Sequence, residues 1–392
     1  MSILNSLFFT LFCSAFIGSA LRIGLVYPLR VVLPLALIFS AITYLSQKNT
    51  RSKPSSLMKY MLFYLFLFYV FTLSSSIMGY VTLHVYPDMN DLFNFTILFL
   101  LLLSVWLYSV VSNNFFKIFT SSVLVMYFVY LLISIIEITT GFHFSDSVSN
   151  ELKLNIPTVF FVNPNDFASI FTLMLMYLMT IYKNRFQWLQ FTIIIIHLGV
   201  IFYTGSRLSI LVLMCFLLFR LKTVLKYGII FGGILLLFYS SFILDFSQQI
   251  IGFVDALSSF TDTSSGVRLE LYKESLHSAI ASFGLGFGVN SSQAYLESLN
   301  NPAFLGIVNP HSSILELLIN SGIIVVLAFL ILKLYIFYVL IKEREFEKSA
   351  HLFFYTIILF SSSSSLFLWS SYLFLMLYVN WAENKIVKSV NA

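Results

Sequence analysis

The chain has 392 residues and a formal net charge of +5; 59% of its residues are hydrophobic, 10% are charged, and its mean hydropathy is +0.92. Soluble globular chains are nearer half apolar and a quarter charged, so this composition excludes a water-soluble enzyme built on one core, and lipid is the expected solvent. The two cysteines, Cys13 and Cys215, lie in separate apolar runs, which argues against a disulfide framework or a cysteine metal site.

Apolar runs long enough to cross a bilayer recur along the chain, whereas the residue alternation of a β-barrel does not. About twelve such segments are expected, and the first is interpreted as a retained span because no clear cleavage site follows it. The last two become one tilted helix unless the Ser361–Ser365 run forms a turn. The segments lie near 3–20, 28–46, 57–83, 92–111, 117–138, 163–182, 187–204, 207–221, 224–244, 309–341, 350–365 and 366–381. This pattern predicts an all-α polytopic membrane protein with about 12 transmembrane helices in a single transmembrane domain over 1–392.

Basic residues predict the orientation of these spans. If the chain crosses the membrane at each predicted span, both termini and every second connecting segment lie on the same side. That side carries 15 of the 22 Lys and Arg residues. Positively charged loops stay in the cytoplasm, so both termini are expected to be cytoplasmic.

Two segments on the opposite side are long. They run from about 139 to 162 and from 245 to 308, the latter between the ninth and tenth spans. Within the second, the spacing of Leu269, Tyr272, Leu276 and Ile280 predicts an amphipathic helix lying on the outer membrane face. The glycines of the following sequence GLGFG are expected to end this helix in a tight turn.

The sequence NPND at 163–166 predicts the start of a helix. Asn163 is a natural cap, Pro164 suits the first helical position, and Asp166 lies in the favourable first turn. We interpret this motif as supporting structure.

Two arginines stand out among the few charges on the outer side. Arg207 closes the tetrapeptide TGSR, which includes Ser206, at the outer end of a span, and Arg268 opens the loop helix in the sequence SSGVR. A cation in the first turn of a helix is disfavoured by the helix dipole unless an anion joins it. Two such guanidinium groups suit a pyrophosphate, although each alone can also be a structural or membrane-snorkelling arginine.

His311 is the candidate general base. In NPHSSILELLINSG, Asn309 and Pro310 predict a helix start, which places His311 in the first turn at the outer interface. The helix dipole would lower the pKa of the imidazole and keep it neutral, as a base requires, although an interfacial histidine can also be structural. Glu316 lies a little over one turn deeper, where a buried carboxylate suggests a role or a pairing with arginine.

The order of these motifs resembles the O-antigen polymerase and ligase superfamily, the Wzy and WaaL-like membrane glycosyltransferases. The motifs that carry the resemblance are NPNDFA, TGSR, SSGVRLELYKES, GLGFGVN with its Asn290, and NPHSSILELLINSG. Two positions depart from the family pattern. Ser312 stands where the family often has Asn, and Asn320 stands where an acidic residue is common.

The resemblance implies a GT-C-like, all-helical enzyme of the bacterial cytoplasmic membrane that acts on its outer face without cofactor or metal. By that resemblance, Arg207 and Arg268 bind the donor pyrophosphate and His311 acts as the base of an inverting transfer. Glu316, Asn163, Asp166, Ser206 and Asn290 are supporting residues. The expected partners are the lipid bilayer, a polyprenyl-pyrophosphate-linked oligosaccharide, a flippase and a chain-length regulator, with no nucleic acid.

Three functions stay open from the sequence. Polymerisation of lipid-linked repeat units into a surface polysaccharide is the first, and ligase-type transfer to lipid A core or to a cell-wall or protein acceptor is the second. A polysaccharide flippase or other transporter is the third. A transporter would carry ionisable residues deep in several spans, and here Glu316 and Lys333 are the good candidates.

Overall fold

The computed structural model describes the chain in segments. The described residues are 3–18, 27–47, 54–84, 89–144, 155–161, 163–183, 187–220, 263–289, 291–304, 309–310, 312–361 and 369–390. Helices make up nearly all of them, and no strand occurs in these ranges.

The helices follow the expected apolar segments closely. The first eight are α1 (Ile3–Ile17), α2 (Pro28–Ser46), α3 (Ser56–Leu83), α4 (Met89–Val111), α5 (Phe115–Thr140), α6 (Pro164–Ile181), α7 (Gln187–Thr204) and α8 (Arg207–Arg220). After a stretch that includes the expected segment 224–244, which lies outside the described residues, come α11 (Thr263–Ala281), α12 (Ser291–Ser298), the short 3-10 helix η1 (Pro302–Phe304), α13 (Ser313–Lys342), α14 (Phe346–Ser361) and α15 (Trp369–Val390). The region 350–381 therefore forms two helices, α14 and α15.

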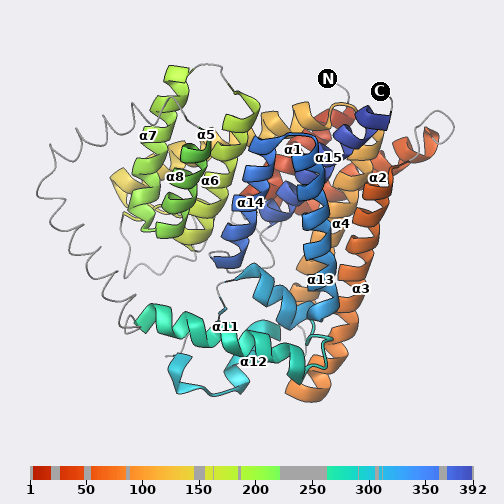
Figure 1. Ribbon diagram of the computed structural model, residues 1–392, viewed down its shortest axis with the longest axis vertical. Coiled ribbons are helices and arrows are strands. Elements are labelled where there is room, and N and C mark those ends of the chain that lie inside the picture. Colours follow the sequence, from red (N-terminus) through yellow and green to blue (C-terminus); the bar gives the residue numbers. More distant parts are fainter. Residues whose placement is uncertain are drawn as a thin grey trace, which may run out of the picture.

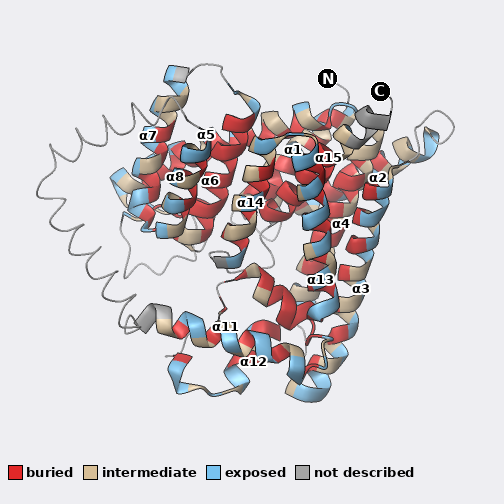
Figure 2. Ribbon diagram, viewed as in Figure 1, coloured by how far each residue is buried: buried red, intermediate tan, exposed pale blue. Residues whose placement is uncertain are grey.

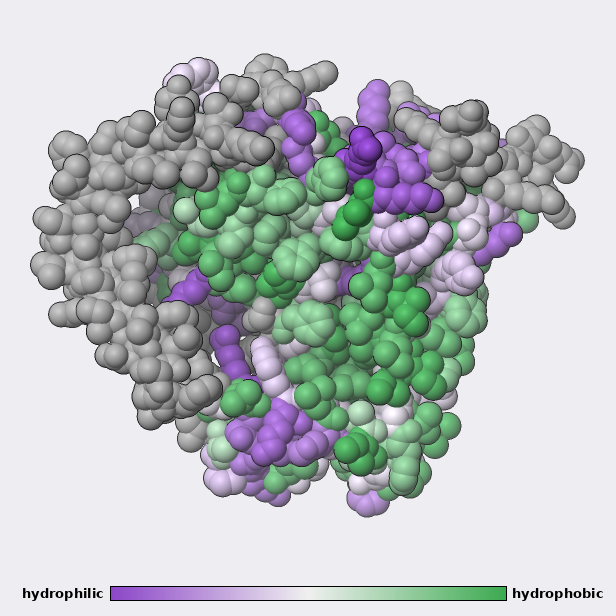
Figure 3. Space-filling model, in the orientation of Figure 1, coloured by the Kyte–Doolittle hydropathy of each residue, from purple (hydrophilic) through white to green (hydrophobic). Residues whose placement is uncertain are grey.

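Five of the described helices, namely α2, α3, α4, α5 and α13, are long and apolar enough to cross a bilayer. Three shorter apolar helices accompany them over Ile3–Ile17, Trp188–Thr204 and Arg207–Phe219. On the face seen in Figure 3, apolar side chains cover most of the coloured middle and polar side chains gather toward the top and bottom, as expected of a protein whose solvent is lipid. The prediction of an all-helical, polytopic membrane protein is confirmed in these terms, while the number of twelve spans stays a prediction.

Two helices form the centre of the bundle. Nearly every described side chain of α6 and of the first half of α15 is buried, whereas α2 exposes an apolar face that includes Val31 and Leu35 (Figure 2). His351 of α14 joins the centre, since its Nδ1 lies 2.6 Å from the Tyr378 hydroxyl and its Nε2 lies 3.0 Å from the Leu173 carbonyl oxygen. Both ring nitrogens are therefore used in packing α14 against α6 and α15.

The polar helices α11 and α12 lie across one end of the bundle (Figure 1). With η1 and the start of α13 they enclose a small hydrophobic cluster of their own, separate from the main core. Its buried members are Val267, Leu271, Phe287, Tyr295, Leu296, Phe304 and Ile319. The region expected as the long outer segment therefore has a packed structure over 263–304, and residues 245–262 lie outside the described part.

The chain direction places α11 and the starts of α8 and α13 at the same end of the bundle. The end of α6, at Ile181, and the start of α14, at Lys348, lie side by side around one cavity. This cavity marks one end of the bundle. Helix α7 runs away from the cavity end and α13 runs toward it, so Arg207, which follows α7, and Ser313, which begins α13, lie at the opposite end.

Candidate functional site

The segment GLGFG, residues 284–288, is bound to a break in α13. At Gly322 the backbone of α13 leaves helical geometry, with φ 80° and ψ 176°. The Phe287 amide donates to the Ile319 carbonyl at 2.8 Å, and the Ile323 amide donates to the Gly284 carbonyl at 2.9 Å. The backbone groups freed by the break are thus paired with the glycine-rich segment, as a buried break requires.

Glycine is required at this contact because the two backbones touch. A Cβ atom on Gly286 would lie 2.6 Å from the Gly322 amide nitrogen, and Gly286 has φ +80°, where other residues are strained. On its other side the segment rests on α3, where Ser75 donates a hydrogen bond to the Leu285 carbonyl and the Val289 amide donates to the Ser76 hydroxyl at 3.3 Å. The expected turn is confirmed, and it also fastens α11 to α3 and α13.

The start of α13 differs from the expectation. The helix begins at Ser313 with Ser312 as its cap, since the Leu315 amide donates to the Ser312 hydroxyl at 3.4 Å. The prediction that Asn309 and Pro310 begin the helix was wrong, because serine caps a helix as well as asparagine does and lies closer to the apolar run. His311, which lies outside the described residues, therefore precedes the cap in sequence and is not in the first turn.

Two polar side chains are buried in the first turns of α13. Glu316 lies in the first turn with an exposed fraction of 6% and is in electrostatic contact with Tyr372 of α15. Asn320 is fully buried; its Oδ1 accepts a hydrogen bond from the Ser291 hydroxyl at 3.1 Å, and its Nδ2 has no partner among the described residues. Asn290, another expected supporting residue, lies outside the described residues.

Arg268 is exposed on α11. The helix begins at Thr263, so the expectation that Arg268 opens it was wrong, and Arg268 falls in the second turn. Burial raises the pKa of the Tyr272 hydroxyl, and the nearby positive charge of Arg268 offsets part of that rise.

Three of the four residues in the predicted outer apolar stripe of α11 are exposed, and Tyr272 is half-buried. Leu269, Leu276 and Ile280 point away from α13, and the opposite face, with Leu271 and Ser275, is buried against the bundle. This arrangement leaves an apolar stripe free to contact lipid, as an interfacial helix requires.

The TGSR tetrapeptide forms the turn between α7 and α8. Gly205 has φ +68°, and the Ser206 hydroxyl donates to the Ser209 hydroxyl at 2.9 Å while its amide donates to Thr204 at 3.2 Å. Ser206 is buried and Arg207 is exposed as the first residue of α8. Ser206 therefore holds the turn between the two helices.

The two arginines belong to different groups of helices. The start of α8 carries Arg207, and α8 packs on α6, α7 and α14, whereas α11, which carries Arg268, packs on α12, α13 and η1. The structure thus places both guanidinium groups at the same end of the bundle on separately packed supports.

The NPND motif has the expected geometry. The Asn163 side chain accepts a hydrogen bond from the Asn165 amide at 2.9 Å, Pro164 is the first residue of α6, and Asp166 lies in the first turn with an exposed fraction of 6%. Asn163 and Asp166 therefore shape the start of the central helix α6.

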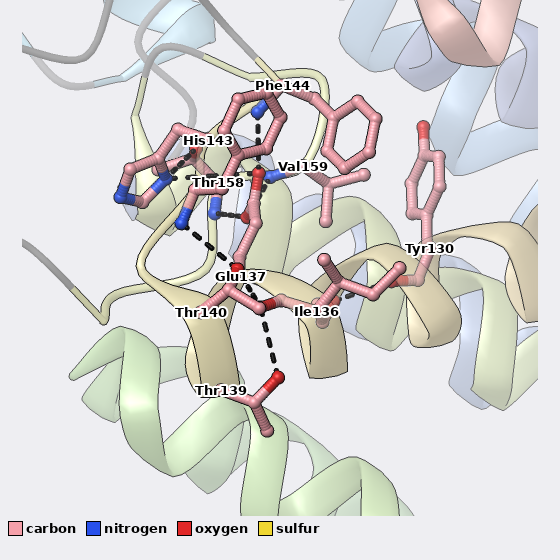
Figure 4. A network of polar contacts seen from close by, with 11 residues as sticks. Tyr130, Ile136, Glu137, Thr139, Thr140, His143, Phe144, Thr158 and Val159 are labelled. Carbon is pink, nitrogen blue, oxygen red and sulfur yellow. Dashed lines mark hydrogen bonds and ion pairs between the residues drawn. The ribbon is translucent and has the colours of Figure 1, made fainter.

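Sequence reasoning missed Glu137, at the end of α5. The residue is fully buried, and its carboxyl group accepts backbone hydrogen bonds from Thr158 at 2.7 Å, from Val159 at 2.8 Å and from Phe144 at 3.2 Å (Figure 4). His143 Nδ1 lies 3.8 Å from the same carboxyl group. Through these bonds Glu137 connects Phe144 with Thr158 and Val159, which come shortly before NPND. Because these partners are distant in sequence, only the three-dimensional structure shows the role of Glu137.

Within the described ranges, no group of three or more His, Cys, Asp and Glu side chains is placed to hold a metal ion. His197 is buried in the bundle between the Tyr127 hydroxyl, 3.1 Å from its Nδ1, and Thr172, 3.5 Å from its Nε2. It therefore serves packing, as does His351.

Comparison with known proteins gives two matches. Residues 191–330 match the family described as O-Antigen ligase, a segment that runs from α7 to α13. The chain is also 28% identical over 257 residues to the teichuronic acid biosynthesis protein TuaE of Bacillus subtilis (strain 168), covering 58% of this chain and 52% of that protein. The chain thus spans about half the length of the curated relative it matches. The predicted resemblance to the O-antigen polymerase and ligase superfamily is confirmed by these matches.

Replacement of Gly286 by alanine should destabilise the protein. Forcing a residue with a side chain into this backbone conformation costs about 1–3 kcal/mol, and the added methyl group also meets the backbone of α13. Thermal unfolding of the purified protein in detergent measures the effect. Gly199→Ala in α7 is the matched control, since its Cβ would meet nothing within 4 Å; an equal loss in both variants would contradict the interpretation of the contact.

Replacement of Glu137 by glutamine should also lower stability, because the amide nitrogen of glutamine cannot accept the backbone hydrogen bonds that a carboxyl oxygen accepts. Hydrogen bonds to charged groups contribute about 1.5–3 kcal/mol. The free energy of unfolding in a denaturant series is the measurement. Glu297→Gln provides the comparison, since this exposed carboxyl group accepts one side-chain bond, from Gln293 at 2.8 Å. Unchanged stability of Glu137→Gln would remove Glu137 from this role.

Proposed function

Because residues 191–330 match the O-antigen ligase family, we propose that this chain is a membrane glycosyltransferase that polymerises polyprenyl-pyrophosphate-linked oligosaccharide repeat units into a surface polysaccharide. The observation that carries the proposal is that the matched segment contains the TGSR turn, α11, the GLGFG contact and the first turns of α13. The reaction takes place outside the cytoplasmic membrane, at the end of the bundle where α11 lies, and both termini are cytoplasmic.

In this mechanism the pyrophosphate of the donor binds between Arg207 and Arg268. Both side chains are exposed at the same end of the bundle, which supports a site open to a lipid-linked substrate. Planar guanidinium groups pair with phosphate oxygens in bidentate geometry and stabilise the pyrophosphate as it leaves with its lipid.

His311 accepts a proton from the attacking hydroxyl group of the acceptor sugar. The hydroxyl oxygen forms a bond to the anomeric carbon from the face opposite the leaving pyrophosphate, and the bond from that carbon to the phosphate oxygen breaks. The configuration at the carbon is therefore inverted. Glu316 and Asn320, buried just beyond the start of α13, supply the polar surroundings on the protein side of this position. No metal ion takes part in the mechanism we propose.

Ligase-type transfer of the glycan to lipid A core, or to a cell-wall or protein acceptor, is the second candidate. The description of the matched family as O-Antigen ligase favours it. The name of the relative, teichuronic acid biosynthesis protein, agrees with a role in surface-polysaccharide synthesis for either activity. The products distinguish the two activities. A polymerase joins repeat units into a longer glycan that is still linked to the polyprenyl lipid, whereas a ligase moves the glycan from that lipid to another acceptor.

Arg207→Ala and Arg268→Ala should each abolish polymer formation while the protein remains inserted and abundant. The corresponding lysine variants should restore little activity, because an ammonium group lacks the planar fork of a guanidinium. Purified protein with a synthetic lipid-pyrophosphate repeat unit provides the assay. Lys273→Ala removes an exposed cation from the same helix as Arg268 and should be active. Normal polymer from either alanine variant would exclude that arginine from the mechanism.

His311→Ala should reduce the rate of polymer formation by about 10²–10⁴, the usual contribution of a positioned general base. Lipid-linked single repeat units would then accumulate. The comparison is His277→Ala, since His277 is exposed on α11 beside Glu274 at 3.3 Å and has no part in the proposal. Equal rates for His311→Ala and wild type would defeat the mechanism, as would activity that stops when a chelator is added.

A further inference from the structure

A cavity of about 640 Å³ lies at the end of the bundle opposite α11. The start of α5, the end of α6, the start of α14 and the end of α15 surround it. Three lysines, Lys117, Lys348 and Lys385, line the cavity, and no acidic residue is among its lining residues in the described part of the chain. The lining therefore carries a concentrated positive charge.

Two of these lysines are held in place by one carboxylate outside the lining. Glu345 forms ion pairs with Lys348, at 3.1 Å, and with Lys385. Burial raises the pKa of the Glu345 carboxyl, but the hydrogen bonds and charges of the two lysines outweigh it and lower the pKa overall. One carboxylate thus pairs with two ammonium groups, so each ammonium group keeps N–H donors that can bind a further anion.

Lys117 has no such partner. It is exposed at the start of α5 and forms no ion pair with a described residue. Lys117 contributes one unbalanced positive charge, and Lys348 and Lys385 together carry one more than Glu345 neutralises. The cavity therefore has an excess of about two positive charges, which an anionic ligand would neutralise.

Apart from the polar side chains of Thr120, Ser121 and Asn384, the remaining wall is apolar and aromatic. Phe116, Tyr182 and Trp381 line it, and the ammonium of Lys348 lies 5.5 Å from the centre of the Trp381 ring. A free inorganic anion would gain nothing from such a wall, whereas a lipid presents a charged phosphate and an apolar chain to it together. The position at the helix ends is also where lipid headgroups lie.

We propose that this cavity binds the phosphate of an anionic phospholipid headgroup, with Lys117, Lys348 and Lys385 as its cationic contacts and the aromatic wall against the first part of the acyl chains. Basic pockets between transmembrane helices bind anionic headgroups by this chemistry. In the proposed orientation the lipid belongs to the cytoplasmic leaflet, on the side away from the glycan chemistry. The site is separate from the proposed catalytic residues.

Lipid binding by the full-length protein tests the proposal without any enzymatic assay. Purified protein in neutral detergent is titrated with phosphatidylglycerol and with phosphatidylcholine, and the thermal unfolding temperature is followed. Phosphatidylglycerol should stabilise the wild type at concentrations where phosphatidylcholine does not. Lys117→Gln should weaken the phosphatidylglycerol effect about fivefold, the contribution of one basic residue near a charged membrane surface, and Lys117→Arg should retain it.

Lys273→Gln, a cation at the other end of the bundle, is the matched control and should bind as the wild type does. Equal phosphatidylglycerol binding by wild type and Lys117→Gln would overturn the proposal. So would stabilisation by sodium phosphate alone with no further effect of the lipid, which would assign the cavity to a soluble anion. Loss of the lipid effect in Lys117→Arg or in Lys273→Gln to the same extent as in Lys117→Gln would also contradict it.

Discussion

The backbone contact between Gly286 and the break of α13 at Gly322 is the constraint on which the outer end of this protein depends. Neither position can carry a side chain without pushing the two segments apart. Through this contact α11 and α12 are fixed to α13, and through Ser75 and Ser76 they are fixed to α3. The polar end that carries Arg268 is therefore held rigidly on helices that cross the membrane, and a site built on rigid supports keeps its geometry better than one on a free loop.

The same contact solves a problem that the membrane imposes. A break in a helix of a membrane bundle frees backbone groups that lipid cannot hydrogen-bond, so it is tolerated only where protein takes their place. Here the amides of Phe287 and Gly288 bind the carbonyls of Ile319 and Asn320, and the Ile323 amide binds Gly284. The break turns the first part of α13, with its buried Glu316 and Asn320, away from the line of the long span and toward α11. The break also places Asn320 beside the GLGFG segment, where its carbonyl accepts from the Gly288 amide.

Local sequence signals predicted much of this arrangement. The apolar runs located the helices, and the Asn163 cap of α6 and the glycine turn at GLGFG form as their residue chemistry requires. The errors came where signals compete or where partners are distant in sequence. Two good caps, Asn309 and Ser312, lie three residues apart, and the helix begins at the one nearer the apolar run. The buried role of Glu137 was missed because its partners lie up to 22 residues away, beyond any local pattern. The break at Gly322 is invisible locally for the same reason, because what stabilises it is the segment around Gly286.

The separation of the two arginines gives the proposed chemistry a further requirement. Arg207 is supported by α6, α7 and α14, and Arg268 by α11 with α12 and α13, so a pyrophosphate held by both must bridge two helix groups. These groups meet mainly where α13 packs on α14, and His351 fixes α14 in turn to the buried centre of α6 and α15. Binding costs less free energy when the groups that receive a ligand are already held in place. In the mechanism we propose, the buried packing of α13, α14 and α6 therefore contributes to donor binding without touching the donor, because it sets the distance between the two guanidinium groups that the pyrophosphate must span.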